Sequence, residues 1–258
     1  RRGMQGDIRS ISRYKEYPTA GPIRWSWGLR ADESTVAATK NHLQERYRMS
    51  EYFDNKARDW DADDMVKQLS SAIGSAILEQ VPLHNQMDVM DFGAGTGLIS
   101  SRVAPLVNRI VAVDTSEAML NELVSKPELH GKVEAVCRDI TDKPLDARFD
   151  LIMSAMAVHH VEDTHKLIQR FAEHLRPGAT LALADLDTED GSFHPDEAAG
   201  VFHHGFERDD LQSILEAHGF EHVRFMTAHT VTREEKAFPV FLVIATKGKG
   251  KPDAGSVS

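Results

Sequence analysis

The stretch Asp91-Phe92-Gly93-Ala94-Gly95-Thr96-Gly97 has the residue types of a ligand-binding turn. Its glycines allow a tight turn and a close approach of backbone and ligand, at the point where a helix would begin. They fall as G-x-G-x-G, whereas a dinucleotide site needs G-x-G-x-x-G, and position 98 is leucine. Asp91 would repel a pyrophosphate, but it would attract a ligand that carries an ammonium and a sulfonium group. The pattern therefore predicts a cationic ligand and disfavours NAD.

Two acidic residues further along the chain could bind the polar parts of a nucleoside. Asp114 lies about 20 residues after the first glycine, where a carboxylate can accept hydrogen bonds from both ribose hydroxyls. Capping of the next helix is its alternative role, but Thr115 and Ser116 already offer capping oxygens. Asp139 could accept a hydrogen bond from an adenine amino group while Ile140 covers the ring. A surface turn is the alternative interpretation of that pair.

Apolar segments with strand character alternate with helical patterns through the middle of the chain. Apolar residues recur every four positions from Met65 to Ile77, which predicts an amphipathic helix over residues 62–80. Strands are expected over residues 87–92, 109–114, 133–137, 149–154 and 180–185. Such alternation implies an α/β domain with a mostly parallel sheet and right-handed crossovers. The last two apolar segments, 222–231 and 238–246, have a short link and are expected to pair antiparallel.

Five motifs stand in the order and spacing of a known family: VMDFGAGTG, VAVDTSEAML, VCRDI, FDLIMSAMAVHHVED and LRPGATLALAD. Over about residues 50–246 the chain resembles the class I S-adenosylmethionine (SAM)-dependent methyltransferases, in particular the branch with the ubiquinone/menaquinone C-methyltransferases. The resemblance implies a Rossmann-like, seven-stranded, mostly parallel sheet with a reversed last strand and helices on both faces. It also implies SAM as the cofactor.

The resemblance assigns the cofactor contacts and a lid. The implied cofactor-binding residues are Tyr52, Trp60, Asp91, Gly93, Ala94, Gly95, Thr115, Asp114, Met119, Asp139, Ile140 and Ala155. The segment YFDNKARDWD, residues 52–61, is similar to the lid that precedes the first strand in this family. Tyr52 and Trp60 are therefore candidates to close over the methionine end of SAM, with packing of the leading helix as the alternative.

Histidines gather where the strands are expected to end. His159 and His160 follow the strand over 149–154, and His194, His203 and His204 lie in a long polar loop after residue 185. An imidazole that titrates near neutrality can deprotonate a methyl acceptor. We predict His160 as the first candidate base, with His159 beside it; packing at a helix start is the alternative for His160. The histidines could also bind a divalent metal, but no His-x-x-x-His pair on a predicted helix would pre-form the site, and no metal site is predicted.

Composition limits the class of acceptor. The 258 residues carry a formal net charge of −10, which disfavours a nucleic-acid backbone as the ligand, although residues 1–48 are basic. The segment Ser154-Ala155-Met156-Ala157 replaces the Asn/Asp-Pro-Pro-aromatic clamp that resembling nucleic-acid enzymes use. Cys137 is the only cysteine, so no intramolecular disulfide can form. With no signal-like or membrane-spanning segment, we expect a soluble, cytoplasmic protein.

These observations give one functional hypothesis and its alternatives. We expect an N-terminal extension over residues 1–48, a methyltransferase domain over 49–247 and a disordered tail over 248–258. The domain should transfer a methyl group from SAM to a small-molecule acceptor, without DNA or membrane as a partner. A protein or RNA methyltransferase recruited through the basic extension is one alternative, and a non-catalytic SAM-binding module is another. The oligomeric state stays open.

Overall fold

A computed structural model describes residues 48–194 and 200–249 of this chain. The chain divides into two units, residues 1–44 and 45–258, and everything described here belongs to the second. The predicted extension over residues 1–48 and the predicted tail over 248–258 lie almost entirely outside the described residues. The boundaries of the predicted methyltransferase domain therefore stay predictions.

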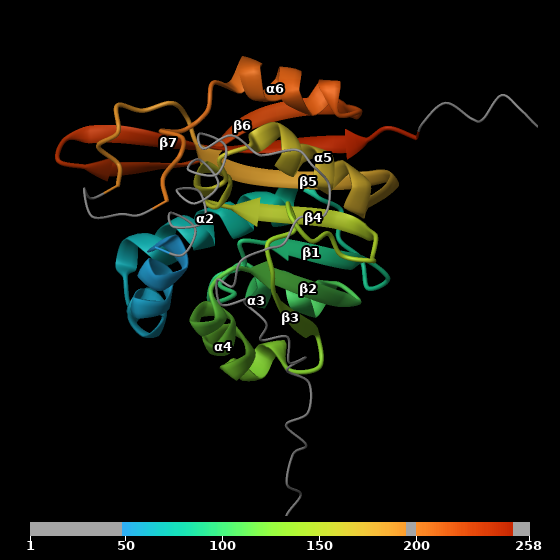
Figure 1. The fold of residues 1–258 in the computed structure, drawn as a ribbon, viewed down its shortest axis with the longest axis horizontal. Coiled ribbons are helices and arrows are strands. Elements are labelled where there is room, and N and C mark those ends of the chain that lie inside the picture. The colour runs from blue at the N-terminus through green and yellow to red at the C-terminus, as the bar shows by residue number, and fades with distance from the viewer. Residues whose placement is uncertain (1–47, 195–199, 250–258) are drawn as a thin grey trace, which may run out of the picture. The chain divides into compact units, whose positions relative to one another are not determined.

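Seven strands form one sheet (Figure 1). They are β1 (Asp88–Phe92), β2 (Arg109–Asp114), β3 (Val133–Cys137), β4 (Phe149–Ala155), β5 (Leu175–Leu186), β6 (Phe220–Arg233) and β7 (Lys236–Lys247). Their order across the sheet is β3-β2-β1-β4-β5-β7-β6. The pairs from β3 to β5 are parallel, whereas β7 runs antiparallel to both of its neighbours. The predicted Rossmann-like sheet with a reversed last strand is confirmed.

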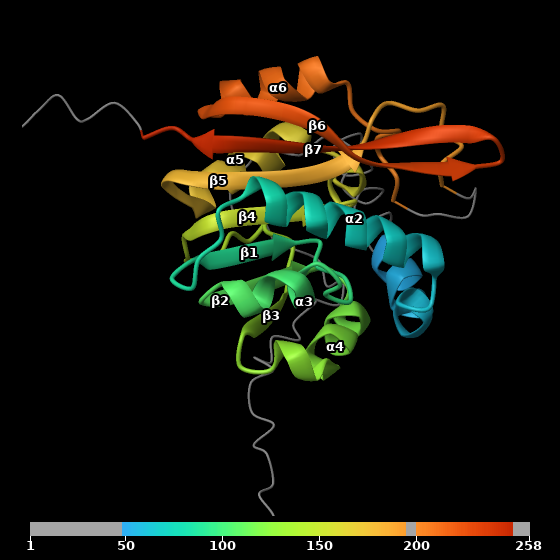
Figure 2. The ribbon, with the colours of Figure 1, turned by 180° about the vertical axis from the view of Figure 1, so that it is seen from behind.

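Helices cover both faces of the sheet, as predicted. They comprise residues 48–60, α2 (Asp64–Gln80), α3 (Ser100–Val103), α4 (Glu117–Ser125), α5 (Thr164–His174) and α6 (Arg208–Ala217). Helices α2 and α3 lie on the face seen in Figure 2, and α5 lies on the opposite face, in front of the sheet in Figure 1. Within the described part of the chain, no helix is both long and apolar enough to cross a bilayer.

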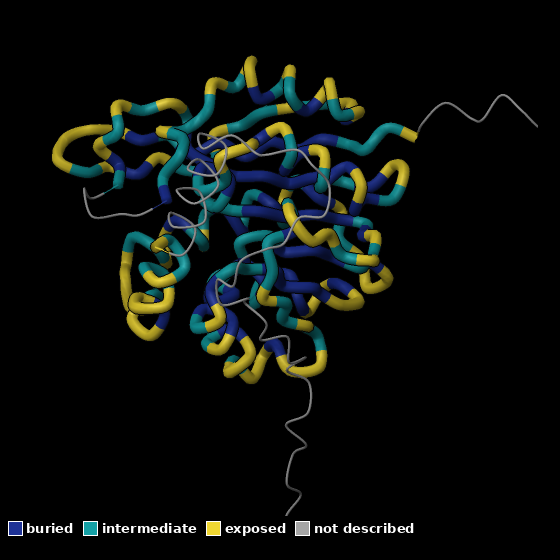
Figure 3. The backbone as a smooth tube through the Cα atoms, in the orientation of Figure 1, coloured by how far each residue is buried: buried dark blue, intermediate teal, exposed yellow. Residues whose placement is uncertain are grey.

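Alternation along the central strands divides the interior into two cores. Val89 and Ala112 point into the core beneath α2, where Ile73 is 1% exposed. Their chain neighbours Met90 and Val111 point into the other core, with Phe171 of α5. Successive side chains of a strand face opposite sides, so strands covered on both faces are apolar throughout. Figure 3 shows the result: the central strands are buried, and the exposed residues lie mainly on the helices, the loops and the edge strand β6.

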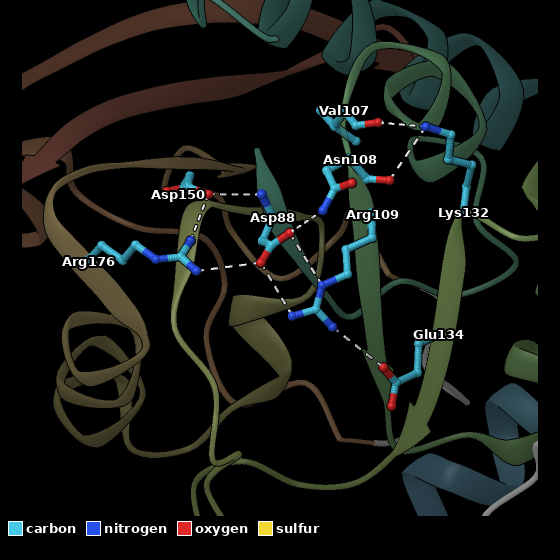
Figure 4. A network of polar contacts seen from close by, with 8 residues as sticks. All are labelled: Asp88, Val107, Asn108, Arg109, Lys132, Glu134, Asp150 and Arg176. Carbon is cyan, nitrogen blue, oxygen red and sulfur yellow. Dashed lines mark hydrogen bonds and ion pairs between the residues drawn. The ribbon is translucent and has the colours of Figure 1, made fainter. Parts of the chain in front are cut away.

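A polar network ties the amino ends of the strands together (Figure 4). Asp88 of β1 accepts hydrogen bonds from Asn108 (2.8 Å) and Arg109 (3.3 Å), and Arg176 donates to Asp150 at 2.6 Å. Burial would raise the pKa of Asp88, but the hydrogen bonds from Asn108, Arg109 and Arg176 outweigh it and lower this pKa. The network lies at the amino ends, so it leaves the carboxyl edge of the sheet free for the candidate site.

Candidate functional site

The glycine turn follows β1 at the carboxyl edge of the sheet. Gly93, Gly95 and Gly97 have φ values of +67°, +53° and +81°, which only glycine adopts readily. The amides of Gly93 and Ala94 donate to the Val113 carbonyl of β2, at 2.9 and 3.1 Å. A Cβ at Gly93 would collide with Ala157, whereas a Cβ at Gly95 would meet nothing within 4 Å. The turn is therefore closed against the chain at Gly93 and open to a ligand at Gly95.

Asp114 is brought to this turn, as its position in the sequence predicts. Its Oδ2 accepts a hydrogen bond from the Gly95 amide at 2.8 Å, and its Oδ1 accepts one from the Ser116 amide at 2.9 Å. Ser116 is the residue that caps α4, since its Oγ accepts from the Met119 amide at 3.1 Å. Burial raises the pKa of Asp114, although these backbone hydrogen bonds oppose the effect. Each carboxylate oxygen can accept a second hydrogen bond, so the ribose contact fits this geometry.

Asp91 lies beneath the turn and is only 4% exposed. Ser100 Oγ donates to its Oδ2 at 2.7 Å. Burial, together with the charge of Asp114, raises the pKa of Asp91 to about 7, and the Ser100 hydrogen bond opposes the shift. Asp91 is buried and Asp114 is half-buried, and neither forms an ion pair with another described residue. Both therefore suit a positively charged ligand, which would favour their ionised forms.

The helix over residues 48–60, here called the leading helix, is fastened to this edge of the sheet. Ser50 Oγ donates to the Thr115 carbonyl at 3.2 Å. Asp54 Oδ1 accepts from Ser116 Oγ at 2.6 Å and from the Ala118 amide at 3.2 Å. Directly after the helix, Asp61 accepts a hydrogen bond from Thr96 of the glycine turn and pairs with Lys126 at 2.6 Å. These contacts hold the predicted lid against the glycine turn and the start of α4.

The two aromatic residues predicted for the lid meet through a third. The rings of Tyr52 and Trp60 both pack edge-on against Phe53, with centroid distances of 5.4 and 5.6 Å. Phe53 in turn contacts the His160 ring at 5.2 Å. The sequence interpretation missed Phe53, Asp54 and Asp61. Their partners lie on distant segments of the chain, so no local sequence pattern indicated these contacts.

The remaining predicted cofactor residues lie on neighbouring elements. Met119 is 2% exposed on α4, and Ala155 ends β4. After β3, Asp139 Oδ1 accepts hydrogen bonds from the amide and hydroxyl of Thr141, both at 2.7 Å. Ile140 is fully buried in the core that also holds Phe171. The Ile140 side chain therefore serves the core, and its proposed contact with adenine stays a prediction.

His159 forms a buried pair with Asp185 at the end of β5. Its Nδ1 lies 2.7 Å from Asp185 Oδ1, and the two side chains are 1% and 0% exposed. The carboxylate also accepts hydrogen bonds from the amides of Val158, His159 and Leu186, at 3.0, 3.2 and 2.8 Å. Burial would raise the pKa of Asp185, but the His159 charge and these hydrogen bonds outweigh it and lower this pKa.

Three of the five predicted histidines come together. The rings of His160 and His194 lie 4.1 and 4.8 Å from the His159 ring, centroid to centroid. Burial and the charge of His159 lower the pKa of His160 to about 3 and that of His194 to about 4. His203 turns away toward the Val161 carbonyl, and His204 is 59% exposed. Across residues 48–194 and 200–249, no three His, Cys, Asp or Glu side chains are placed to hold a metal ion.

Similarity to known proteins agrees with this geometry. Residues 89–178 match the family described as a methyltransferase domain. An uncharacterised methyltransferase of Schizosaccharomyces pombe is 34% identical over 135 residues, which cover 46% of this chain and 48% of that protein. An O-methyltransferase of Aspergillus nomiae is 27% identical over 185 residues, covering 67% of this chain and 80% of that protein. This chain spans about half of the length of its curated relatives above 30% identity.

Solved structures share the fold. The N-methyltransferase NodS of Bradyrhizobium japonicum, in complex with S-adenosylhomocysteine (SAH), superposes with a TM-score of 0.61 and 15% identity, over 79% of this chain and 98% of that chain. At this identity the likeness concerns the fold. Residues 89–178 thus match a methyltransferase domain, and the glycine turn at the end of β1 and the order of the strands are those of the class I methyltransferase fold.

Proposed function

We propose that this chain transfers a methyl group from SAM to a small-molecule acceptor. The observation that carries the proposal is the arrangement of the glycine turn, in which the Asp114 carboxylate fixes the Gly95 amide at 2.8 Å and Gly95 faces open space. A nucleoside can approach the backbone there while its ribose hydroxyls donate to Asp114. When bound, SAM supplies a methyl group on a positively charged sulfur.

The carboxylates and the leading helix supply the remaining cofactor contacts. Asp91 is buried beneath the turn and favours the cationic methionine end of SAM over a pyrophosphate. Tyr52 and Trp60, packed around Phe53, would exclude water from that end. The other residues proposed to line the cofactor are Gly93, Ala94, Thr115, Met119, Asp139, Ile140 and Ala155.

A small acceptor suits the burial of the histidine cluster. His159 is 1% exposed, and Phe53 covers His160, so an acceptor atom must reach an enclosed position at this edge. The net charge of −10 also disfavours nucleic acid. The relatives differ in the acceptor atom, since one is named an O-methyltransferase and another an N-methyltransferase. The ubiquinone/menaquinone-like branch stays part of the proposal.

Two measurements test the proposal. Calorimetry should give micromolar to sub-millimolar dissociation constants for SAM and SAH and no competition from NAD or ATP; tighter NAD binding would refute the cofactor assignment. Cell extract incubated with the protein and methyl-labelled SAM is then separated by size. Label in the small-molecule fraction is expected. Label confined to protein or RNA would support the macromolecular alternative, and SAH binding without any transfer would support a SAM-binding module.

A further inference from the structure

One ring nitrogen of the buried His159 side chain forms no hydrogen bond with the described residues. The Asp185 carboxylate accepts three backbone hydrogen bonds besides that of His159, so its position is fixed and its ionised form is favoured. An ionised carboxylate only accepts hydrogen bonds, and His159 Nδ1 must therefore carry the proton between them. The Nε2 atom of His159 then bears the lone pair in the neutral ring.

This Nε2 is buried and has no hydrogen-bond partner among the described residues. The same holds for Nε2 of His194, whose ring centroid lies 4.8 Å from that of His159. Nearly all buried polar atoms in proteins are paired, because a buried polar atom without a hydrogen bond destabilises the folded state. Two such atoms on neighbouring rings indicate a place where a ligand supplies a small polar group.

The place adjoins the proposed methyl donor site. Ala157, two residues before His159, contacts Gly93 of the glycine turn so closely that a Cβ there would collide with it. Met156 just before it has a φ of +54°, an uncommon conformation for a residue other than glycine and one that clusters at functional sites. On the other side, Phe53 of the leading helix contacts His160. The imidazoles therefore lie between the glycine turn and the leading helix.

We infer that His159 is the general base of the reaction and that the methyl-accepting atom is the oxygen of an un-ionised hydroxyl, as in a phenol or enol. This inference rests on the proposed function. The hydroxyl proton passes to His159 Nε2 while an oxygen electron pair forms the new bond to the methyl carbon. The carbon–sulfur bond breaks, and its electron pair stays on sulfur, which becomes neutral. Asp185 is the positioning residue that stabilises the imidazolium, and the proton later leaves to solvent.

Charge favours a hydroxyl over an amine. A neutral amine attacks without prior loss of a proton, so a buried base would add little to its reaction, whereas an un-ionised hydroxyl is a weak nucleophile that needs one. A protonated amine would need a carboxylate partner, but both oxygens of Asp185 are already occupied.

His160 fits this role less well than His159. Its Nδ1 lies 2.8 Å from the Gly200 carbonyl and must donate to it, and among the described residues no carboxylate forms a hydrogen bond with the ring. Burial lowers its pKa to about 3, so it would be a weak base at neutral pH. We therefore place His160 in the wall of the site, where it supports Phe53.

The test uses two phenols that differ in their need for a base. Phenol has a pKa of about 10, like tyrosine, and is un-ionised at about pH 8, whereas 4-nitrophenol is largely ionised there. With methyl-labelled SAM, His159→Ala should slow single-turnover methylation of phenol by about 10²–10⁴, but should change that of 4-nitrophenol far less. The exposed His165→Ala is the matched control and should change neither. An equal loss on both phenols, or no loss, would overturn the role of His159.

Two further readouts separate this inference from the proposed function. Nitrogen-15 NMR of the full chain should find the proton of the neutral His159 ring on Nδ1, and Asp185→Asn should disturb that tautomer; a neutral ring with its proton on Nε2 would refute the assignment. SAH binding is measured on every variant. If the wild type does not bind SAH, the proposed function itself is wrong. If it binds SAH and methylates aniline but neither phenol, only the hydroxyl assignment is wrong.

Discussion

The raised pKa of Asp91 predicts in which direction the stability of the protein changes with pH. Burial moves this pKa from 3.8 to about 7, so the folded protein binds the proton more tightly than the unfolded chain. The contribution of Asp91 to stability is then greatest at low pH and is lost as pH rises from about 4 to about 7. Each pKa unit corresponds to about 1.4 kcal/mol, so the ionised carboxylate costs the folded state about 4 kcal/mol at pH 8 and less than about 1 kcal/mol at pH 4.

Asp91→Asn removes the titration and keeps an oxygen that can accept from Ser100. We expect the variant to exceed the wild type in free energy of unfolding by up to about 4 kcal/mol at pH 8, with the gain shrinking toward pH 4. Urea unfolding at several pH values measures this difference. Asp88→Asn is the matched control with the opposite sign, because hydrogen bonds lower the pKa of Asp88. A stability difference that does not change with pH would refute the reasoning.

The same substitution should weaken SAM binding. A cationic ligand favours the ionised form of Asp91, so the affinity of the wild type for SAM should fall by up to about tenfold per pH unit below pH 7. Asp91→Asn should bind SAM more weakly at pH 8 and lose this pH dependence. Calorimetry at pH 6, 7 and 8 checks it, and parallel pH profiles for the two proteins would show that Asp91 does not contact the ligand charge.

Three other substitutions test separate parts of the site and fold. Asp114→Ala should raise the dissociation constant of SAH by more than about tenfold, because a charge-assisted hydrogen bond contributes about 1.5–3 kcal/mol; an unchanged constant in calorimetry would limit Asp114 to supporting the turn. Asp54→Ala removes the contacts of the leading helix with Ser116 and Ala118 and should speed SAH dissociation in stopped flow by about 3–30-fold, whereas the exposed Glu51→Ala should not. Arg176→Ala should lower the free energy of unfolding by about 0.5–1 kcal/mol in urea and leave SAH affinity unchanged, since Arg176 bridges Asp150 and Asp88 at the amino ends of the strands.

The sequence alone determined the layered fold and the glycine turn. Strand segments such as residues 110–113 are apolar throughout because both faces are covered, and the four-residue repeat from Met65 to Ile77 fixes which face of α2 is buried. The glycine turn could be predicted because positive φ values strongly favour glycine over other residues. Asp114 was readable because consecutive parallel strands end at the same edge, so a residue at the end of β2 must lie near the turn after β1.

Only the tertiary structure decided the roles of the histidines. His159 and His160 are adjacent in sequence and equal in type, but Asp185, 26 positions away, lies beside the first and not the second. Likewise His194, unlike His203 and His204, joins the pair because of the path of the loop after β5. The anchoring of Phe53 and Asp54 was equally hidden. Such contacts join distant segments, and their burial and hydrogen bonding set which nitrogen keeps a free lone pair.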